Sequence, residues 1–200
     1  LFYVVMIFSN FIAPYGGDQR FIEYLYAPPQ GLHWNRQDGL HTYALEMQFD
    51  KETLKSIYKS DVKTVVPIKF FVRDMEYTIL GVFKSNIHLF GSGDKTHPVF
   101  LFGSDRQGRD MFSRLLIGSQ MSLTIGLVGV ALSLMIGSVM GVASGYFSGW
   151  IDNLMQRLIE VIRSFPTIPL WMALSAALPQ HWPPERVYFA ITVILSFIGW

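Results

Sequence analysis

A run of 37 residues without Lys, Arg, Asp or Glu, from Leu115 to Ile151, constrains the fold more than any other feature of this chain. It directly follows a short stretch with five charges, between Asp105 and Arg114. Of the chain's 31 charged residues, 25 lie between Pro14 and Leu116, so the sequence combines a soluble-like segment with a lipid-like one. The net charge of +1 leaves no basic face of useful size and argues against a nucleic-acid partner.

The uncharged run predicts a membrane-spanning helix over residues 119–145. As a helix it would be ~40 Å long, enough to cross a hydrocarbon core of ~30 Å with some tilt. Small residues recur along one side of it, at Gly118, Ser122, Gly126, Gly129, Ser133, Gly137, Gly141 and Gly145. In water each glycine would weaken a helix by about 1 kcal/mol, whereas in lipid small residues let another helix approach closely. We call this side the small-residue ribbon and expect it to pack inside a helix bundle.

Further helices are expected on both sides of this one. Residues 1–13 are apolar and are ended by Pro14, so we expect them to be the end of a first membrane helix. Residues 164–178 and 187–200 are apolar too, and they predict two more membrane helices. Both terminal segments are shorter than the ~20 residues that a span needs, so we expect a fragment that begins and ends inside membrane helices. Two short buried helices of a soluble protein are the alternative.

The segment between the second and third membrane helices is expected to be amphipathic. Residues 146–150 (YFSGW) form an aromatic break of the kind found at a membrane surface. In residues 152–163 the apolar and polar residues recur at helical spacing, so that they would lie on different faces of a helix. The arginines are divided between both ends of the spanning helix, and long domains cross a membrane regardless of charge, so charge gives no orientation.

Residues 14–103 are too long and too polar for a simple loop, and we expect a small α+β insertion. Two β-branched and aromatic runs, 67–73 and 77–84, suggest a hairpin that turns at Asp74-Met75-Glu76. Residues 99–103 suggest a further strand, and residues 50–61 suggest a helix. The fold class expected from these patterns is an all-α polytopic membrane protein carrying this insertion.

The charged stretch predicts a short helix at the membrane surface over residues 104–118. Ser104 and Gln107 fit a capping box, and Asp110 and Arg114 have the spacing of a helical ion pair. Such a helix could lie with its polar face in water and its apolar face in lipid or protein, then turn into the spanning helix near Gly118. The alternative is a solvated flank without a function.

These residues carry a resemblance to a known family. The string from Leu101 to Gly126 resembles a segment of the permeases of the dipeptide/oligopeptide/nickel ABC importer family, which typically read GTD-x-x-GRD-x-x-SRL-x-x-G before their second membrane helix. The matching positions are Gly103, Asp105, Gly108, Arg109, Asp110, Ser113, Arg114, Leu115, Gly118, Ser122, Leu123 and Gly126. Ser104 stands where the family usually has threonine.

A second stretch extends the resemblance over residues 102–200, about half of the chain. It is similar to the family's cytoplasmic-side motif at Gly145, Gly149, Asp152, Arg157, Ser164, Phe165 and Pro166. Gln156 and Glu160 depart from the family's commonest residues. The similarity is closest to the C-type subunit, one of two different permeases that pair.

The resemblance implies part of an ABC importer type I transmembrane fold in a bacterial inner membrane. Residues 14–116 would be extracytoplasmic and residues 152–163 cytoplasmic. The implied partners are a second permease subunit, two ATP-binding subunits, an extracytoplasmic substrate-binding protein and the lipid bilayer. ATP would be bound by the partners, so no cofactor is expected in this chain, and the family's ATPase-contacting loop would lie beyond Trp200. We expect the insertion to shape the docking of the binding protein.

The chemistry-bearing residues give no enzyme signature. The chain lacks a Gly-Lys pair, and therefore a Walker A motif, and it lacks cysteine and an H-E-x-x-H string, so no metal site or catalytic residue is predicted. Two alternatives to a permease remain. One is a membrane-anchored sensor or binding protein whose ligand domain is residues 14–102. The other is an interfacial enzyme that uses Asp105, Arg109 and Asp110.

Overall fold

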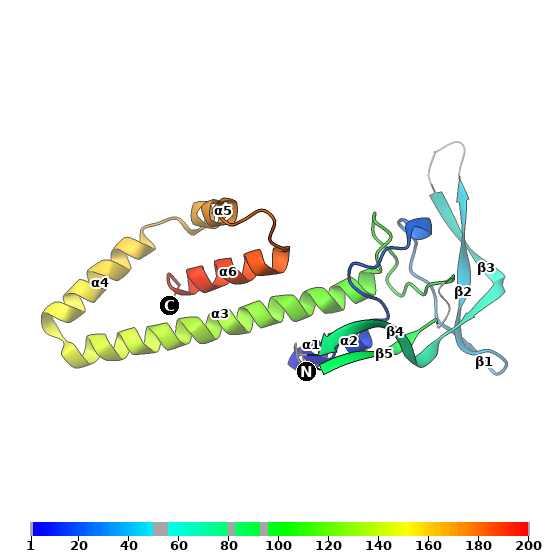
Figure 1. The fold of residues 1–200 in the computed structure, drawn as a ribbon, viewed down its shortest axis with the longest axis horizontal. Helices are drawn as coiled ribbons and strands as arrows, with labels where there is room; N and C mark the ends of the chain where they lie inside the picture. The colour runs from blue at the N-terminus through cyan, green and yellow to red at the C-terminus, as the bar shows by residue number, and fades with distance from the viewer. Residues whose placement is uncertain (1, 50–55, 80–82, 93–95, 200) are drawn as a thin grey trace. The chain divides into compact units, whose positions relative to one another are not determined.

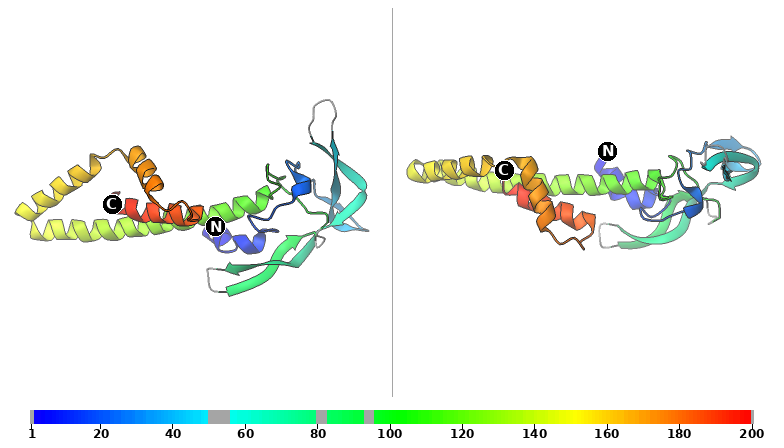
Figure 2. Two further views of the ribbon diagram at one scale, coloured as in Figure 1. Left: turned by 45° about the horizontal axis from the view of Figure 1, so that its top comes forward. Right: turned by 90° about the horizontal axis from the view of Figure 1, so that it is seen from above.

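The structure is a computed structural model that describes residues 2–49, 56–79, 83–92 and 96–199 (Figures 1 and 2). The chain divides into two compact units, Leu1–Gln120 and Met121–Trp200. The first unit holds two short helices and all the described strands, and the second is helical.

The first unit begins with helices α1, Phe2–Ile7, and α2, Ser9–Ile12. The helix expected over residues 1–13 is therefore present in two pieces, with non-helical backbone at Phe8. Pro14 ends α2, because the residue before a proline is pushed out of the helical region, and Ala13 is extended. The short 3-10 helix η1, Ile22–Tyr24, follows.

Among the described residues of the first unit, five strands form two antiparallel sheets. The three-stranded sheet has the order β1-β2-β3, with β1 at His33–Asn35, β2 at Gly39–Phe49 and β3 at Ser56–Pro67. The two-stranded sheet pairs β4, Lys69–Ile79, with β5, Phe83–Gly91.

The structure corrects three details predicted for the insertion. Residues 56–61, expected in a helix, belong to strand β3, while residues 50–55 lie outside the described residues. The hairpin exists, but the predicted turn at residues 74–76 lies inside β4, where the register with β5 is irregular between Arg73 and Tyr77. The link between β4 and β5 falls at residues 80–82, outside the described part of the chain. The insertion is thus β-rich, and among its described residues η1 is the only helical segment.

The third correction concerns residues 99–103, which were expected to form a strand but are irregular. Their backbone groups are satisfied from elsewhere. The Phe100 N–H donates to Gln30 Oε1 at 2.6 Å, the Gln30 N–H donates to the Phe100 carbonyl at 2.9 Å, and the Val99 N–H donates to the Tyr15 hydroxyl at 2.7 Å. These bonds replace the ladder that a strand would need.

The core of the first unit lies where this irregular segment meets the three-stranded sheet. Val99 and Phe100 are completely buried. One cluster joins Val99 to Ala44, Val66 and Ile68, and another joins Phe100 to Ala27 and Leu45. The segment is therefore held by apolar packing as well as by the hydrogen bonds from side chains.

Helix α3, Met111–Phe147, starts in the first unit and continues into the second. Its 37 residues would extend ~55 Å, and it contains the whole span predicted at 119–145. The separate surface helix predicted for residues 104–118 is wrong: residues 104–110 form a turn, and α3 is continuous through Gly118. Among the described residues, α3 is the one helix long and apolar enough to cross a membrane.

Three more helices complete the second unit: α4, Gly149–Arg163, α5, Thr167–Ala177, and α6, Pro184–Ser196. The helices expected at 164–178 and 187–200 correspond to α5 and α6. Ser148 and Gly149 have positive φ values of 46° and 62°, which ends α3 before α4 begins. The expected fold class is only partly met, because the chain contains substantial β-sheet in addition to the long apolar helix.

Candidate functional site

The family-motif residues of the charged stretch are brought together by a turn at residues 103–110, which we call the motif turn. Its ends are joined by the Met111 N–H, which donates to the Gly103 carbonyl at 3.0 Å. Ser104 is not a helix cap. Its hydroxyl accepts from the Ala27 N–H at 2.8 Å and donates to the Tyr24 carbonyl. The predicted capping box is therefore wrong, because the Ser104 hydroxyl instead fastens the turn to the segment that contains Tyr24 and Ala27.

Asp105 is the centre of the motif turn. Its Oδ1 accepts from the backbone N–H groups of Gln107 at 2.8 Å and Arg109 at 3.0 Å. Its Oδ2 accepts from Arg109 Nη2 and Arg114 Nη1, both at 2.7 Å. Arg114 therefore pairs with Asp105, and the predicted pair of Arg114 with Asp110 is not formed.

The ionised form of Asp105 is favoured by these contacts. Burial opposes ionisation, since the side chain is only 12% exposed. The hydrogen bonds from Arg109 and Gln107 and the charge of Arg109 outweigh burial and lower the pKa of Asp105 from 3.8 to about 2. The turn thus holds a fixed negative charge between two arginines.

Asp110 has a different role, at the N-terminus of helix α3. Its Oδ2 accepts from the Ser113 N–H at 2.8 Å, which is the bond of an N-cap. The side chain is 1% exposed, and its Oδ1 has no hydrogen-bond partner within the described part of the chain. Burial raises the pKa of this carboxyl above its usual range, against the hydrogen bonds from Ser113 and Phe112.

Two glycines of the motif let the segment 21–27 lie directly on the turn. Gly103 and Gly108 have φ values of +76° and +71°. A Cβ at Gly103 would lie 2.5 Å from the Ala27 carbonyl oxygen, and one at Gly108 would lie 2.1 Å from the Phe21 carbonyl oxygen. The Phe21 N–H also donates to the Gly108 carbonyl at 2.9 Å. Only glycine fits at both places.

Sequence reasoning missed the partners of the motif turn. Besides segment 21–27, Tyr15 contributes, because its N–H donates to Ser113 Oγ at 3.2 Å. Its hydroxyl is buried, which raises its pKa to about 12. Pro14 and the Gly16-Gly17 pair mark a bend at this point, but nothing local to residues 15–27 indicates a partner some 90 residues away.

Chemically, the motif turn is a joint that fixes the insertion to the first turn of α3. All the side-chain contacts of Asp105 are made within the turn or by α3, and Asp110 is buried. Neither carboxylate is open to a substrate, which counts against the interfacial enzyme considered above. Among the described residues, no three His, Cys, Asp or Glu side chains are grouped as metal ligands.

The small-residue ribbon contacts helix α6 at Gly129, within the second unit. A Cβ at Gly129 would lie 3.0 Å from Thr192 Cγ2 of α6, and Ser196 Oγ of α6 donates to the Gly129 carbonyl at 3.4 Å. By contrast, a Cβ at Gly118, Gly126, Gly141 or Gly145 would meet nothing within 4 Å. The described residues therefore leave these four ribbon glycines uncovered.

We expect Gly129→Leu to separate α3 from α6 and to lower the stability of the second unit by about 1 to 3 kcal/mol, because the larger side chain must displace Thr192. Gly141→Leu is the matched control, with open space around the added atoms. Thermal unfolding followed by circular dichroism in detergent measures both variants. An equal midpoint for the two would contradict the Gly129 contact.

The predicted cytoplasmic-side motif does not form one cluster. Asp152 of α4 accepts from Ser144 Oγ of α3, which ties the two helices across the break. Arg157 pairs with Glu160 at 2.8 Å on an exposed surface. Ser164 Oγ donates to the Val161 carbonyl, Phe165 is exposed, and Pro166 precedes α5. Asp152 thus lies in the first turn of α4 and Pro166 directly precedes α5, and no contact joins the two residues.

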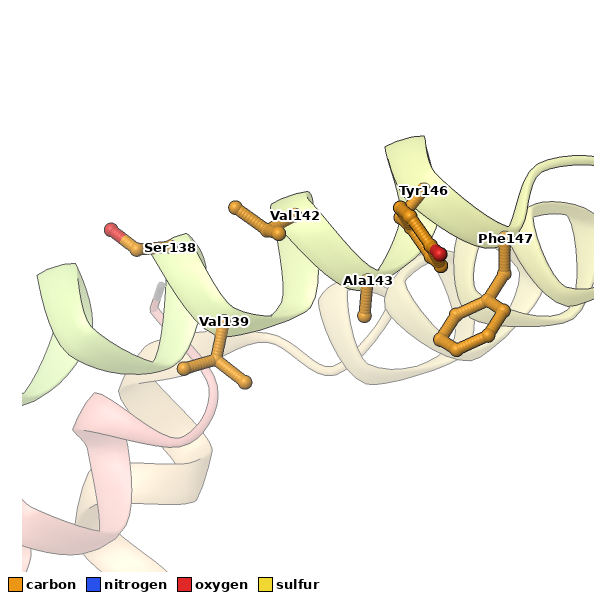
Figure 3. A pocket seen from close by; sticks show the side chains of 6 residues that line it. All are labelled: Ser138, Val139, Val142, Ala143, Tyr146 and Phe147. Carbon is orange, nitrogen blue, oxygen red and sulfur yellow. The ribbon is translucent and has the colours of Figure 1, made fainter.

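The C-terminal part of α3 has a shallow apolar hollow of about 480 Å³ (Figure 3). Its walls come from one helix only, with Ser138, Val142 and Tyr146 along one row and Val139, Ala143 and Phe147 along the next. A site enclosed on several sides would need walls from other elements. This hollow is a helix surface rather than a substrate pocket.

Comparison with known proteins finds curated permeases over part of the chain. It is 49% identical over 77 residues to the probable D,D-dipeptide transport system permease protein DdpC of Escherichia coli, which is 38% of this chain and 26% of that protein. It is 41% identical over 95 residues to the glutathione transport system permease protein GsiD of Pectobacterium atrosepticum, 48% of this chain and 32% of that protein.

A third relative is the oligopeptide transport system permease protein OppC of Haemophilus influenzae, 35% identical over 99 residues, 50% of this chain and 30% of that protein. The chain thus spans about a third or less of the length of these relatives. No family model and no solved structure matches the chain. The resemblance predicted from the motifs is confirmed: the matched part of this chain is similar to permease subunits of peptide ABC transporters.

Proposed function

We propose that this chain is part of an inner-membrane permease subunit of an ATP-driven importer for peptides or similar solutes. The observation that carries the proposal is the identity of 35 to 49% to permeases whose names specify dipeptide, glutathione or oligopeptide transport. The long apolar helix α3 supports it, because a permease must cross the bilayer.

The proposed mechanism is alternating access, driven by two ATP-binding partner subunits. This chain and a second permease subunit would each form half of the path, and a substrate-binding protein would deliver the solute from outside. The open glycines of the ribbon, Gly118, Gly126, Gly141 and Gly145, support a helical partner, since small residues with free space around them offer a close-packing surface in lipid. The insertion would lie outside the membrane, fastened to α3 by the motif turn.

The proposal is tested in the bacterium that carries the gene. Deleting the gene is expected to abolish uptake of radiolabelled peptides, and the intact gene supplied in trans should restore it. An affinity-tagged copy should be recovered from the inner-membrane fraction together with an ATP-binding subunit. Recovery of the tagged protein in the soluble fraction would contradict the proposal. So would peptide uptake that is unchanged after deletion of the gene.

A further inference from the structure

The hairpin of β4 and β5 carries apolar side chains that its own unit leaves uncovered. Phe71 is 66% exposed and Phe83 is 68% exposed, and Ile87 is exposed too. Side chains alternate across a strand, so Phe83 and Ile87 lie on the same face of β5, and Ile79 pairs with Phe83 across the hairpin. Grouped exposed apolar residues of this kind mark an interaction surface.

The hairpin packs beside the end of the N-terminal helices (Figures 1 and 2). The rings of Phe71 in β4 and Phe11 in α2 have centroids 6.3 Å apart. His88 of β5 is buried, and its Nδ1 lies 2.6 Å from the Ala13 carbonyl oxygen just after α2. These contacts fix the hairpin to α2.

Helix α2 in turn is fixed to the beginning of α3. Ser9 Oγ donates to Gln120 Oε1 at 3.0 Å, and Asn10 Nδ2 lies 3.4 Å from the same oxygen. Gln120 lies six residues after Arg114, the last charged residue before the uncharged run. The hairpin is therefore attached at the level where α3 leaves its charged surroundings and becomes wholly uncharged.

We propose that the exposed apolar face of the β4–β5 hairpin rests on the lipid bilayer, at the interface beside α3. Lipid is the favoured occupant because α1, the end of a proposed span, lies beside the hairpin in Figure 1 and itself exposes apolar side chains, Phe2 and Val4. Aromatic side chains are suited to the depth of lipid headgroups. Lys84 beside Phe83 and Arg73 opposite Ile87 can extend their charged ends to lipid phosphates. The inference rests on the proposed function for the membrane position of α3.

The chain contains no cysteine, so single-cysteine variants can be labelled cleanly with a nitroxide. The full chain and its partner subunits are reconstituted in vesicles of phosphatidylcholine and phosphatidylglycerol. Collision rates are measured with oxygen, which concentrates in lipid, and with a water-soluble nickel chelate. We expect Phe83→Cys and Ile87→Cys to give an oxygen-to-nickel ratio several-fold higher than Val62→Cys, a position on β3 that is as exposed as Phe83.

Val139→Cys on α3, which is 64% exposed in this chain, reports separately on membrane insertion. If position 139 shows high oxygen accessibility while positions 83 and 87 match position 62, the hairpin lies in water and this inference is wrong, although the permease proposal stands. Positions 83 and 87 shielded from both reagents would show a protein partner on the hairpin, which also overturns it. A water-like ratio at position 139 as well would overturn the inference together with the proposed function.

Discussion

Gly108→Ala is expected to unfold the joint between the insertion and helix α3, with a loss of about 2 to 5 kcal/mol. Two effects add. The positive φ of +71° disfavours any residue with a Cβ by about 1 to 2 kcal/mol. The new Cβ would also lie 2.1 Å from the carbonyl oxygen of Phe21, so the backbone of one segment must move, at a further cost of about 1 to 3 kcal/mol. The shift would break the hydrogen bond from Phe21 to Gly108 as well.

Gly39→Ala separates the two effects. Gly39 has a φ of +66° in the same unit, but a Cβ there would meet nothing within 4 Å. We expect this control to lose only the conformational part, about 1 to 2 kcal/mol. Both are measured as the shift in thermal unfolding midpoint of the full chain in detergent, followed by tryptophan fluorescence. Equal losses in the two variants would show that segment 21–27 does not press on the motif turn.

The helical half of the fold could be predicted because the features that mark its helices, uncharged apolar runs and the breaks between them, lie within the helices' own residues. The absence of charge over residues 115–151 indicates a long apolar helix, and α3 covers almost all of it. The break before α4 was marked by the aromatic and glycine-containing residues 146–150. Helix ends were less accurate: α3 begins at Met111 because Asp110 caps it, whereas the capping-box pattern had predicted a helix that starts at Ser104.

The strands and the motif turn were harder to predict because their contacts are distant in sequence. Leu54, Ile57 and Tyr58 have the spacing of one helix face, which predicted a helix over residues 50–61, but residues 56–61 pair with β2 instead. Arg114 has an acid four residues before it in Asp110, yet the turn brings Asp105 to Arg114 and leaves Asp110 buried as a cap. Local spacing identified the residues of the candidate site, while the segment 21–27 that they hold became visible only in the fold.

The charge of Asp105 is the second feature whose loss should have a large effect. Asp105→Asn keeps an oxygen for the backbone N–H groups of the turn but removes the charge that holds Arg109 and Arg114. The lowered pKa of Asp105, about 2 against 3.8, corresponds to about 2 kcal/mol of stability at neutral pH. We expect the variant to lose this amount at pH 7. Glu160→Gln, whose carboxylate pairs with Arg157 on an exposed surface, should lose about 0.5 kcal/mol or less.

The pH dependence distinguishes lost charge from damaged packing. Because folding depresses the pKa of Asp105, its contribution is fully present above pH 3.8 and is lost as the pH falls toward 2. The difference in unfolding midpoint between the wild type and Asp105→Asn should therefore be constant from pH 7 to pH 5 and shrink below pH 4. A difference that stays the same down to pH 2.5 would mean that the asparagine perturbs the shape of the turn, and that the two arginines do not depend on the negative charge. A shrinking difference would identify the motif turn as an electrostatic joint, in which the Asp105 carboxylate ties the turn to Arg114 at the start of α3.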